Sequence, residues 1–126
     1  MAYTHTPLQQ VIESGIAPVA KQYSASGRVS LNETVADDQT NFQLSFALDV
    51  SAVKSFILQS DVDCLVETND GSTPDDTISL KAGVPYVWNT DSYNAFLFTE
   101  DITALFVTTA DGAANIQCEA LIDVTP

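Results

Sequence analysis

Basic residues are scarce in this chain, and their scarcity excludes a class of partner. Lys21, Arg28, Lys54 and Lys81 stand against 17 acidic residues, which gives a formal net charge of −13 at pH 7. Affinity for a phosphate backbone comes mainly from Lys and Arg side chains that displace counterions. Attraction to anionic membrane surfaces needs the same basic clusters. We therefore expect neither nucleic acid nor membrane among the partners.

Histidine is also nearly absent, and this limits the chemistry available. His5 is the only histidine. A zinc site needs about four nitrogen or sulfur ligands, and a catalytic nucleophile usually needs a histidine base. His5 stands near the N-terminus, where we expect an exposed, non-catalytic side chain. With no P-loop, dinucleotide fingerprint or His-Glu-x-x-His pattern, we predict no catalytic residue, metal or cofactor, and hence a protein that is not an enzyme.

The only cysteines are Cys64 and Cys118, and both stand among alternating apolar residues. That setting is typical of reduced thiols in a core, although a disulfide between them stays open. No apolar run approaches the roughly 18 residues needed to cross a bilayer. The N-terminus has neither the basic region nor the apolar region of a signal peptide, so we expect no export signal.

What the chain does contain is a period of two. At 126 residues it is long enough for one core that buries roughly two thirds of the unfolded surface. Apolar and polar residues alternate along 42–50, 62–66, 84–88 and 116–122, as in strands that bury one face. We expect the core to include Phe42, Phe46, Leu48, Val62, Val66, Phe106, Ile116 and Ile122.

Turn residues separate these runs at short intervals and give about eight or nine strands without helical crossovers. This pattern favours an all-β fold, an antiparallel β-sandwich of the jelly-roll type. Before Pro18 the signal differs, because Leu8, Val11 and Ile12 have helical spacing after Pro7. We therefore predict an N-terminal arm or short helix over residues 1–16 and a sandwich domain over residues 17–126.

Two features admit alternatives. The acidic loop at 67–76 could bind calcium or could simply be solvated; it lacks the ligand spacing of an EF-hand. The aromatic residues of 86–98 could be core, or some of them, especially Trp88 and Tyr93, could lie on a contact surface.

The segments "DTISLKAGVPYVW" and "ITALFVTTADGAANIQCEALID" carry a family resemblance. This part of the chain, roughly residues 62–124, resembles the small β-sandwich structural proteins of tailed bacteriophages, in particular capsid decoration or cement proteins. The resemblance implies a non-enzymatic virion protein that stabilises the phage head by bridging subunits of the major capsid protein. The alternative is a carbohydrate-binding or host-attachment module.

The resemblance further implies that the protein is made in the host cytoplasm, lies on the capsid exterior, and associates with itself as a dimer or trimer. The arm would dock on a neighbour, because an apolar stripe is costly to leave in water. We expect the partner contacts to include Tyr3, Leu8, Val11, Ile12, Ile16, Trp88 and Tyr93.

Overall fold

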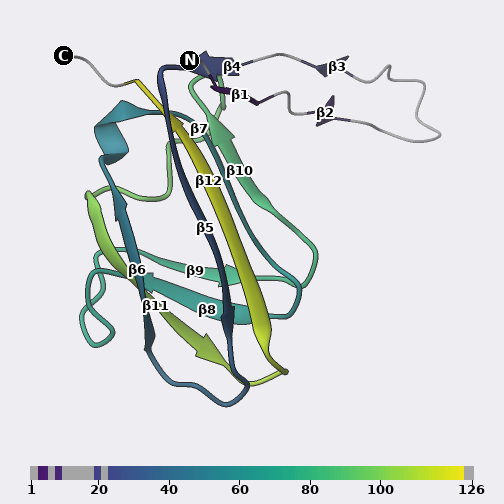
Figure 1. The fold of residues 1–126 in the computed structure, drawn as a ribbon, viewed down its shortest axis with the longest axis vertical. Coiled ribbons are helices and arrows are strands. Elements are labelled where there is room, and N and C mark those ends of the chain that lie inside the picture. The colour runs from purple at the N-terminus through teal and green to yellow at the C-terminus, as the bar shows by residue number, and fades with distance from the viewer. Residues whose placement is uncertain (1–2, 6–7, 10–18, 21–22, 124–126) are drawn as a thin grey trace.

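The computed structural model describes residues 3–5, 8–9, 19–20 and 23–123, and in these ranges two four-stranded antiparallel sheets form a sandwich (Figure 1). We name each sheet after a central strand. The β12 sheet has the order β10 (Tyr86–Asn89), β7 (Val53–Ser60), β12 (Ala114–Ile122), β5 (Gly27–Val35). The β11 sheet has the order β6 (Phe42–Leu48), β11 (Ile102–Thr109), β8 (Cys64–Thr68), β9 (Thr77–Leu80). The all-β sandwich predicted from the sequence is confirmed.

The strand order is that of a jelly roll. Numbered from β5 to β12 along the chain, the first, third, sixth and eighth strands form the β12 sheet, and the others form the β11 sheet. Every connection between successive strands crosses to the other sheet, except the hairpin from β8 to β9. This alternation winds the chain into the two Greek keys of a jelly roll. The topology agrees with the architecture expected from the turn spacing.

The one helical turn among the described residues is the 3₁₀ turn η1 (Val50–Ala52), which links β6 to β7. Asp49 caps it, because its Oδ1 accepts a hydrogen bond of 3.1 Å from the Ser51 amide. Within the described ranges no helix has both the length and the apolar character that a membrane crossing requires.

Period-two burial explains why the two sheets pack. Along β6 the side chains of Leu44, Phe46 and Leu48 are buried, while Ser45 and Ala47 between them are exposed. The inner face of the opposite sheet contributes further apolar side chains to the same core. The fully buried members include Phe56, Leu58, Ile116, Val66, Leu105 and Val107. Each such side chain stabilises the fold by about 1.5–3 kcal/mol relative to exposure.

The predicted core is largely found, with two corrections. Phe46, Leu48, Val66 and Ile116 are buried, and Val62 and Ile122 are half-buried and pack against the core. Phe42 is 43% exposed, because it begins an edge strand and the sandwich does not cover that end. Phe106 is half-buried on the outer face of the β11 sheet, where its partners in register are Gln43 and Glu67. Placing Phe42 and Phe106 in the core was therefore wrong.

Cys64 and Cys118 are free thiols, and both are buried. Desolvation raises the pKa of each thiol, and the raise is the larger for Cys118, which Glu119 further disfavours as a thiolate. Of the two alternatives, reduced core thiols and a disulfide, the structure shows the first.

The N-terminal segment forms strands where it is described. β1 (Tyr3–His5) pairs with β4 (Tyr23–Ala25), and β2 (Leu8–Gln9) pairs with β3 (Val19–Ala20). Leu8 is therefore extended rather than helical. A segment this short is not stable as an isolated helix, whereas a strand gains hydrogen bonds from a partner. Of the arm and the helix, the described residues form an arm; Val11, Ile12 and Ile16 lie outside them.

Two phenylalanines on β6 give a matched test of the core. We expect Phe46→Ala to lower the free energy of unfolding by about 3–5 kcal/mol, because it opens a cavity in a close-packed interior. Phe42→Ala, the same change on the same strand, should cost far less, since that side chain is already 43% exposed. Urea unfolding of both variants measures the difference. Equal losses would contradict this description of the core.

The buried thiol of Cys118 predicts a loss of stability at alkaline pH. Above about pH 8.5 an unfolded thiol releases its proton, whereas desolvation keeps the pKa of Cys118 raised in the folded protein. The folded state then binds more protons, so its stability falls as pH rises through this range, by up to about 1.4 kcal/mol per pH unit. In Cys118→Ala, the free energy of unfolding measured with urea should depend less steeply on pH between neutral pH and the alkaline range above about pH 8.5. If the variant showed the same slope of unfolding free energy against alkaline pH as the wild type, the Cys118 thiol would not be the cause of the loss.

Candidate functional site

The N-terminal strands form a ribbon that begins on the outer face of the β12 sheet. Tyr3 pairs with Ala25 and His5 with Tyr23, and Leu8 pairs with Ala20 in the same register, since each pair of residue numbers sums to 28. The two short strand pairs therefore belong to one antiparallel ribbon. β1 and β4 lie against β7 and β12, while β2 and β3 lie beyond the sandwich at one end (Figure 1).

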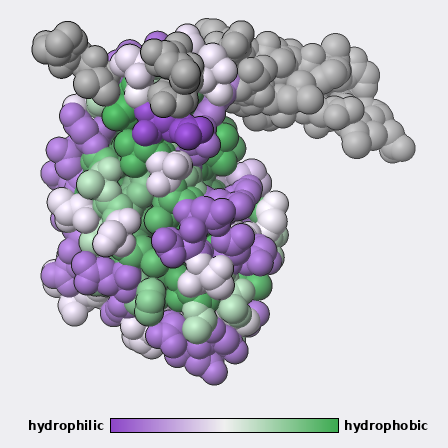
Figure 2. All heavy atoms as spheres, in the orientation of Figure 1, coloured by the Kyte–Doolittle hydropathy of each residue, from purple (hydrophilic) through white to green (hydrophobic). Residues whose placement is uncertain are grey.

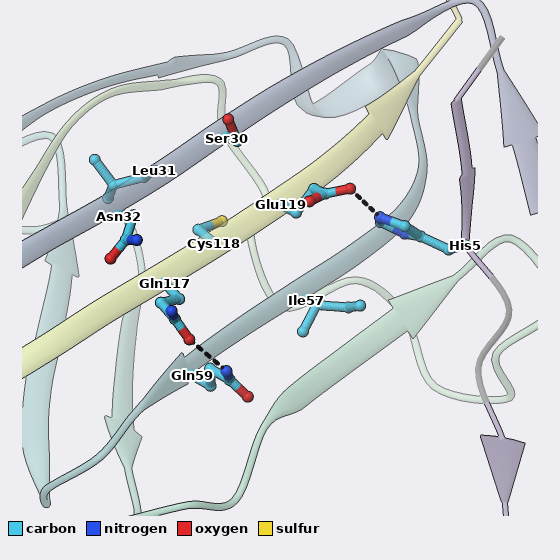
Figure 3. Close-up of a pocket in the computed structure, with 9 residues that line it drawn as sticks. All are labelled: His5, Ser30, Leu31, Asn32, Ile57, Gln59, Gln117, Cys118 and Glu119. Atoms are coloured by element: carbon cyan, nitrogen blue, oxygen red, sulfur yellow. Dashed lines mark hydrogen bonds and ion pairs between the residues drawn. The ribbon is translucent and has the colours of Figure 1, made fainter.

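His5 anchors this ribbon to the sheet. Its Nδ1 lies 2.7 Å from Ser55 Oγ on β7, and its Nε2 lies 2.8 Å from Glu119 Oε1 on β12 (Figure 3). A carboxylate can only accept, so Nε2–H donates to Glu119 and the other ring nitrogen meets the Ser55 hydroxyl. His5 is 8% exposed. The expectation that His5 is an exposed residue was wrong, because the ribbon folds back onto the sheet and buries it.

Part of the outer face of the β12 sheet is buried beneath the anchored ribbon. Ser55 and Leu121 are opposite each other in register on β7 and β12, on the same face as Glu119, and both are fully buried. An outer face of an antiparallel sheet normally meets water. The ribbon therefore creates a small second interior, in which the Ser55 hydroxyl needs the His5 ring as its partner.

Serine, histidine and glutamate side chains in one chain of hydrogen bonds resemble the parts of a hydrolytic triad, and their accessibility decides what they can do. A nucleophilic serine must reach a substrate carbonyl. Ser55 has no exposed surface, and it does not line the neighbouring groove. The arrangement holds the ribbon in place, and it presents no nucleophile to a ligand.

A groove of about 390 Å³ lies beside the anchor on the same outer face. Figure 3 shows lining side chains on three neighbouring strands of the sheet and His5 on β1, with Glu119 reaching His5 and Gln117 reaching Gln59. The lining residues are His5, Ser30, Leu31, Asn32, Ile57, Gln59, Gln117, Cys118 and Glu119. Most of the side chains that face it are polar and uncharged. In the orientation of Figure 1, the sandwich surface in Figure 2 shows hydrophobic patches between hydrophilic ones.

The aromatic residues proposed for contact separate into two kinds. Trp88 is half-buried, stacks on Phe96 at a centroid distance of 4.7 Å, and donates its Nε1–H to the Asn94 carbonyl. Tyr86 also packs inward, with its hydroxyl accepting from the Leu97 amide. Tyr93, by contrast, is fully exposed. Of the two aromatic contact residues named from the sequence, the structure presents Tyr93 openly and gives Trp88 a packing role.

The arm residues named for contact are only partly placed. Tyr3 and Leu8 lie in the paired strands of the ribbon, whereas Val11, Ile12 and Ile16 fall outside the described residues. The ribbon thus places β1, which contains Tyr3, against β12, whereas β2, which contains Leu8, lies beyond the sandwich (Figure 1).

The acidic loop after β8 uses its carboxylates to shape the loop. Asp70 accepts from the Ser72 and Thr73 amides, and these bonds hold its pKa below the ordinary value. Asp76 accepts from the Thr99 amide at 2.8 Å and so joins this loop to the segment before β11. Within the described ranges, no group of three or more histidine, cysteine, aspartate or glutamate side chains is placed to hold a metal ion.

Comparison of the chain with protein-family profiles, with curated proteins and with solved structures gave no match.

Sequence reasoning missed the anchor and the groove. His5 lies 50 residues from Ser55 and 114 from Glu119, so no local pattern links them. One signal was present: Gln117 and Glu119 alternate with buried residues on β12, which places polar side chains together on an outer face. The arrival of the ribbon on that face had no comparable signal.

The anchor predicts the cost of losing His5. We expect His5→Ala to destabilise the protein by about 1–3 kcal/mol, because the buried Ser55 hydroxyl loses its partner. Amide hydrogen exchange should accelerate in β1 and β4 more than in the central strands, since the ribbon opens first. Thr4→Ala, a change at the exposed neighbouring position, is the matched control and should have little effect. Equal effects of the two substitutions would show that the ring does not anchor the ribbon.

Proposed function

We propose that this chain is a non-enzymatic virion protein that decorates a phage capsid and bridges neighbouring subunits of the major capsid protein. The observation that carries the proposal is the N-terminal ribbon, which is anchored at its base by His5 and continues as β2 and β3 beyond the sandwich (Figure 1). Such an arm can reach a subunit that the sandwich itself does not cover.

The physical argument concerns the stability of the ribbon. A two-stranded hairpin is at best marginally stable in water when nothing packs on it. The base of the ribbon packs on β7 and β12, where His5 and Ala25 are buried. The outer pair, β2 with β3, lies away from that support (Figure 1). A partner surface would support this outer pair, and a neighbouring capsid subunit or a second copy of the chain fits this requirement.

The sandwich suits a bridging role for a different reason. Its strands form two Greek keys around one core, and two of its four edge strands, β9 and β10, have only four residues each, which limits edge-to-edge aggregation at those edges. A compact body with a separate arm can bind two surfaces at once, and linked contacts gain affinity through effective concentration. Tyr93 offers a further exposed anchor of the kind that protein interfaces use.

The acidity of the chain supports the proposal that its partner is a protein with a basic surface. The formal net charge of −13 favours encounter with a positively charged surface and opposes nucleic acid. Attachment to the capsid should then weaken as the salt concentration rises, because salt screens contacts between exposed charges.

A carbohydrate-binding module that stacks sugars on aromatic rings would need Tyr86, Trp88 and Tyr93 as an exposed platform. Tyr86 and Trp88 instead pack against Phe96 and the core. The packing of this aromatic cluster, Tyr86, Trp88 and Phe96, therefore favours the structural role over a stacking platform. The burial of Ser55 favours a protein without hydrolytic activity.

Shortening the ribbon tests the proposal. Replacing residues 7–21 by Asn-Gly retains His5 and keeps the register between β1 and β4, because Asn-Gly favours two-residue hairpin loops. The variant should keep the stability of the sandwich, yet bind heads stripped of the chain at least about tenfold more weakly, or about 1.4 kcal/mol. Urea unfolding and co-sedimentation with purified heads measure the two properties separately.

A second variant, Tyr93→Ala in the full chain, tests the contact proposed outside the ribbon and should also weaken binding to heads. Unchanged binding by the shortened variant would remove the ribbon from the attachment surface. Absence of the chain from purified virions, judged by mass spectrometry and cryo-EM, would overturn the proposed function. The same maps and the mass of the free protein in solution decide whether copies associate as dimers or trimers.

A further inference from the structure

The groove beside His5 contains a row of amide side chains that crosses three strands. Gln117 on β12 is directly opposite Asn32 on β5 and Gln59 on β7. Side chains at directly opposite positions in antiparallel strands lie on the same face of the sheet and close together. The three amides therefore form a continuous polar strip across the β12 sheet.

Much of the hydrogen-bonding capacity of this strip is open. Gln59 Nε2 donates to Gln117 Oε1 at 2.7 Å, which orients both amides and leaves the Gln59 oxygen and the Gln117 NH₂ group for other partners. Ser30 and Asn32 are exposed, and their side chains make no hydrogen bond to another residue in the described ranges. The groove thus offers both donors and acceptors at fixed positions.

The strip is nearly free of charge on a strongly acidic protein. The chain carries 17 acidic residues, but Glu119 is the only one that lines the groove, and one of its oxygens already accepts from His5. A cationic ligand would find more negative charge at other places on this protein, and an anionic ligand would be repelled by the net charge of −13. The groove is therefore suited to a neutral, polar ligand.

An apolar element completes the site. Ile57 lies between the His5–Glu119 pair and the Gln59–Gln117 pair in Figure 3, and it is half-buried. Val87 on the edge strand β10 is opposite Ile57 and is 37% exposed. A sugar ring has hydroxyl groups at its rim and C–H groups on its faces, so it matches amides around an aliphatic patch.

We infer that this groove binds a neutral saccharide, with Asn32, Gln59 and Gln117 hydrogen-bonding its hydroxyls and Ile57 contacting its apolar face. The free Glu119 oxygen accepts from a further hydroxyl. The volume of about 390 Å³ is at the lower end of small-molecule sites, which suits a mono- or disaccharide unit. The site differs in position and residues from the aromatic cluster and does not depend on capsid attachment.

A printed array of neutral and anionic glycans tests the inference with the full-length chain. We expect binding to neutral hexose or N-acetylhexosamine glycans and none to sialylated or sulfated ones. Titration of the strongest neutral glycan by NMR should then show about a three- to tenfold loss of affinity in Gln117→Ala and in Asn32→Ala, because each substitution removes hydrogen bonds to the ligand. Asn32 is exposed on an edge strand, so its variant should fold even if Gln117→Ala does not.

The matched control is Gln43→Ala, which removes an exposed glutamine from the outer face of the other sheet and should leave affinity unchanged. The inference is overturned by a wild-type protein that binds no neutral glycan at millimolar concentration. It is equally overturned by saccharide binding that survives Gln117→Ala and Asn32→Ala or that is lost with Tyr93→Ala, since these results place the ligand elsewhere.

Discussion

The burial of one face of each strand between the two sheets is the constraint on which the other features depend. Because side chains alternate across a strand, fixing Ile116, Cys118 and Ala120 in the core forces Gln117 and Glu119 to the outside. A shift of one residue in register would reverse both faces. The outer face of the β12 sheet is therefore a direct consequence of the core, although none of its side chains contributes to that core.

The N-terminal ribbon divides this outer face into two regions with different physics. Under the ribbon, Leu121 and Ser55 are buried, and the His5 ring satisfies the hydroxyl that would otherwise lack a partner. Beside the ribbon, the amide row remains open to solvent as a groove. One imidazole with its two hydrogen bonds thus separates a small interior from a polar surface that can accept a ligand.

The ribbon and the groove fit together in one functional account. In the proposed arrangement the ribbon and the sandwich attach the chain to a capsid, and the groove is a separate site whose ligand is a neutral saccharide. A saccharide held by a few amide hydrogen bonds binds weakly at one site. Many copies on one particle would raise the overall affinity through multivalency without any new contact. The acidic surface would at the same time repel nucleic acid from the decorated particle.

The sequence was enough to predict the fold class, since alternation and turn spacing are local properties that survive without tertiary information. It also placed Phe46, Val66 and Ile116 in the core correctly. It failed for Phe42 and Phe106, because alternation does not reveal where a strand end is left uncovered or which face a bulged strand presents; the register of β11 shifts between Ile102 and Ala104. The anchor and the amide row, by contrast, became visible in the folded protein alone. His5, Ser55 and Glu119, like Asn32, Gln59 and Gln117, meet through strand pairings between distant parts of the chain, and such pairings are set by the whole topology rather than by any local pattern.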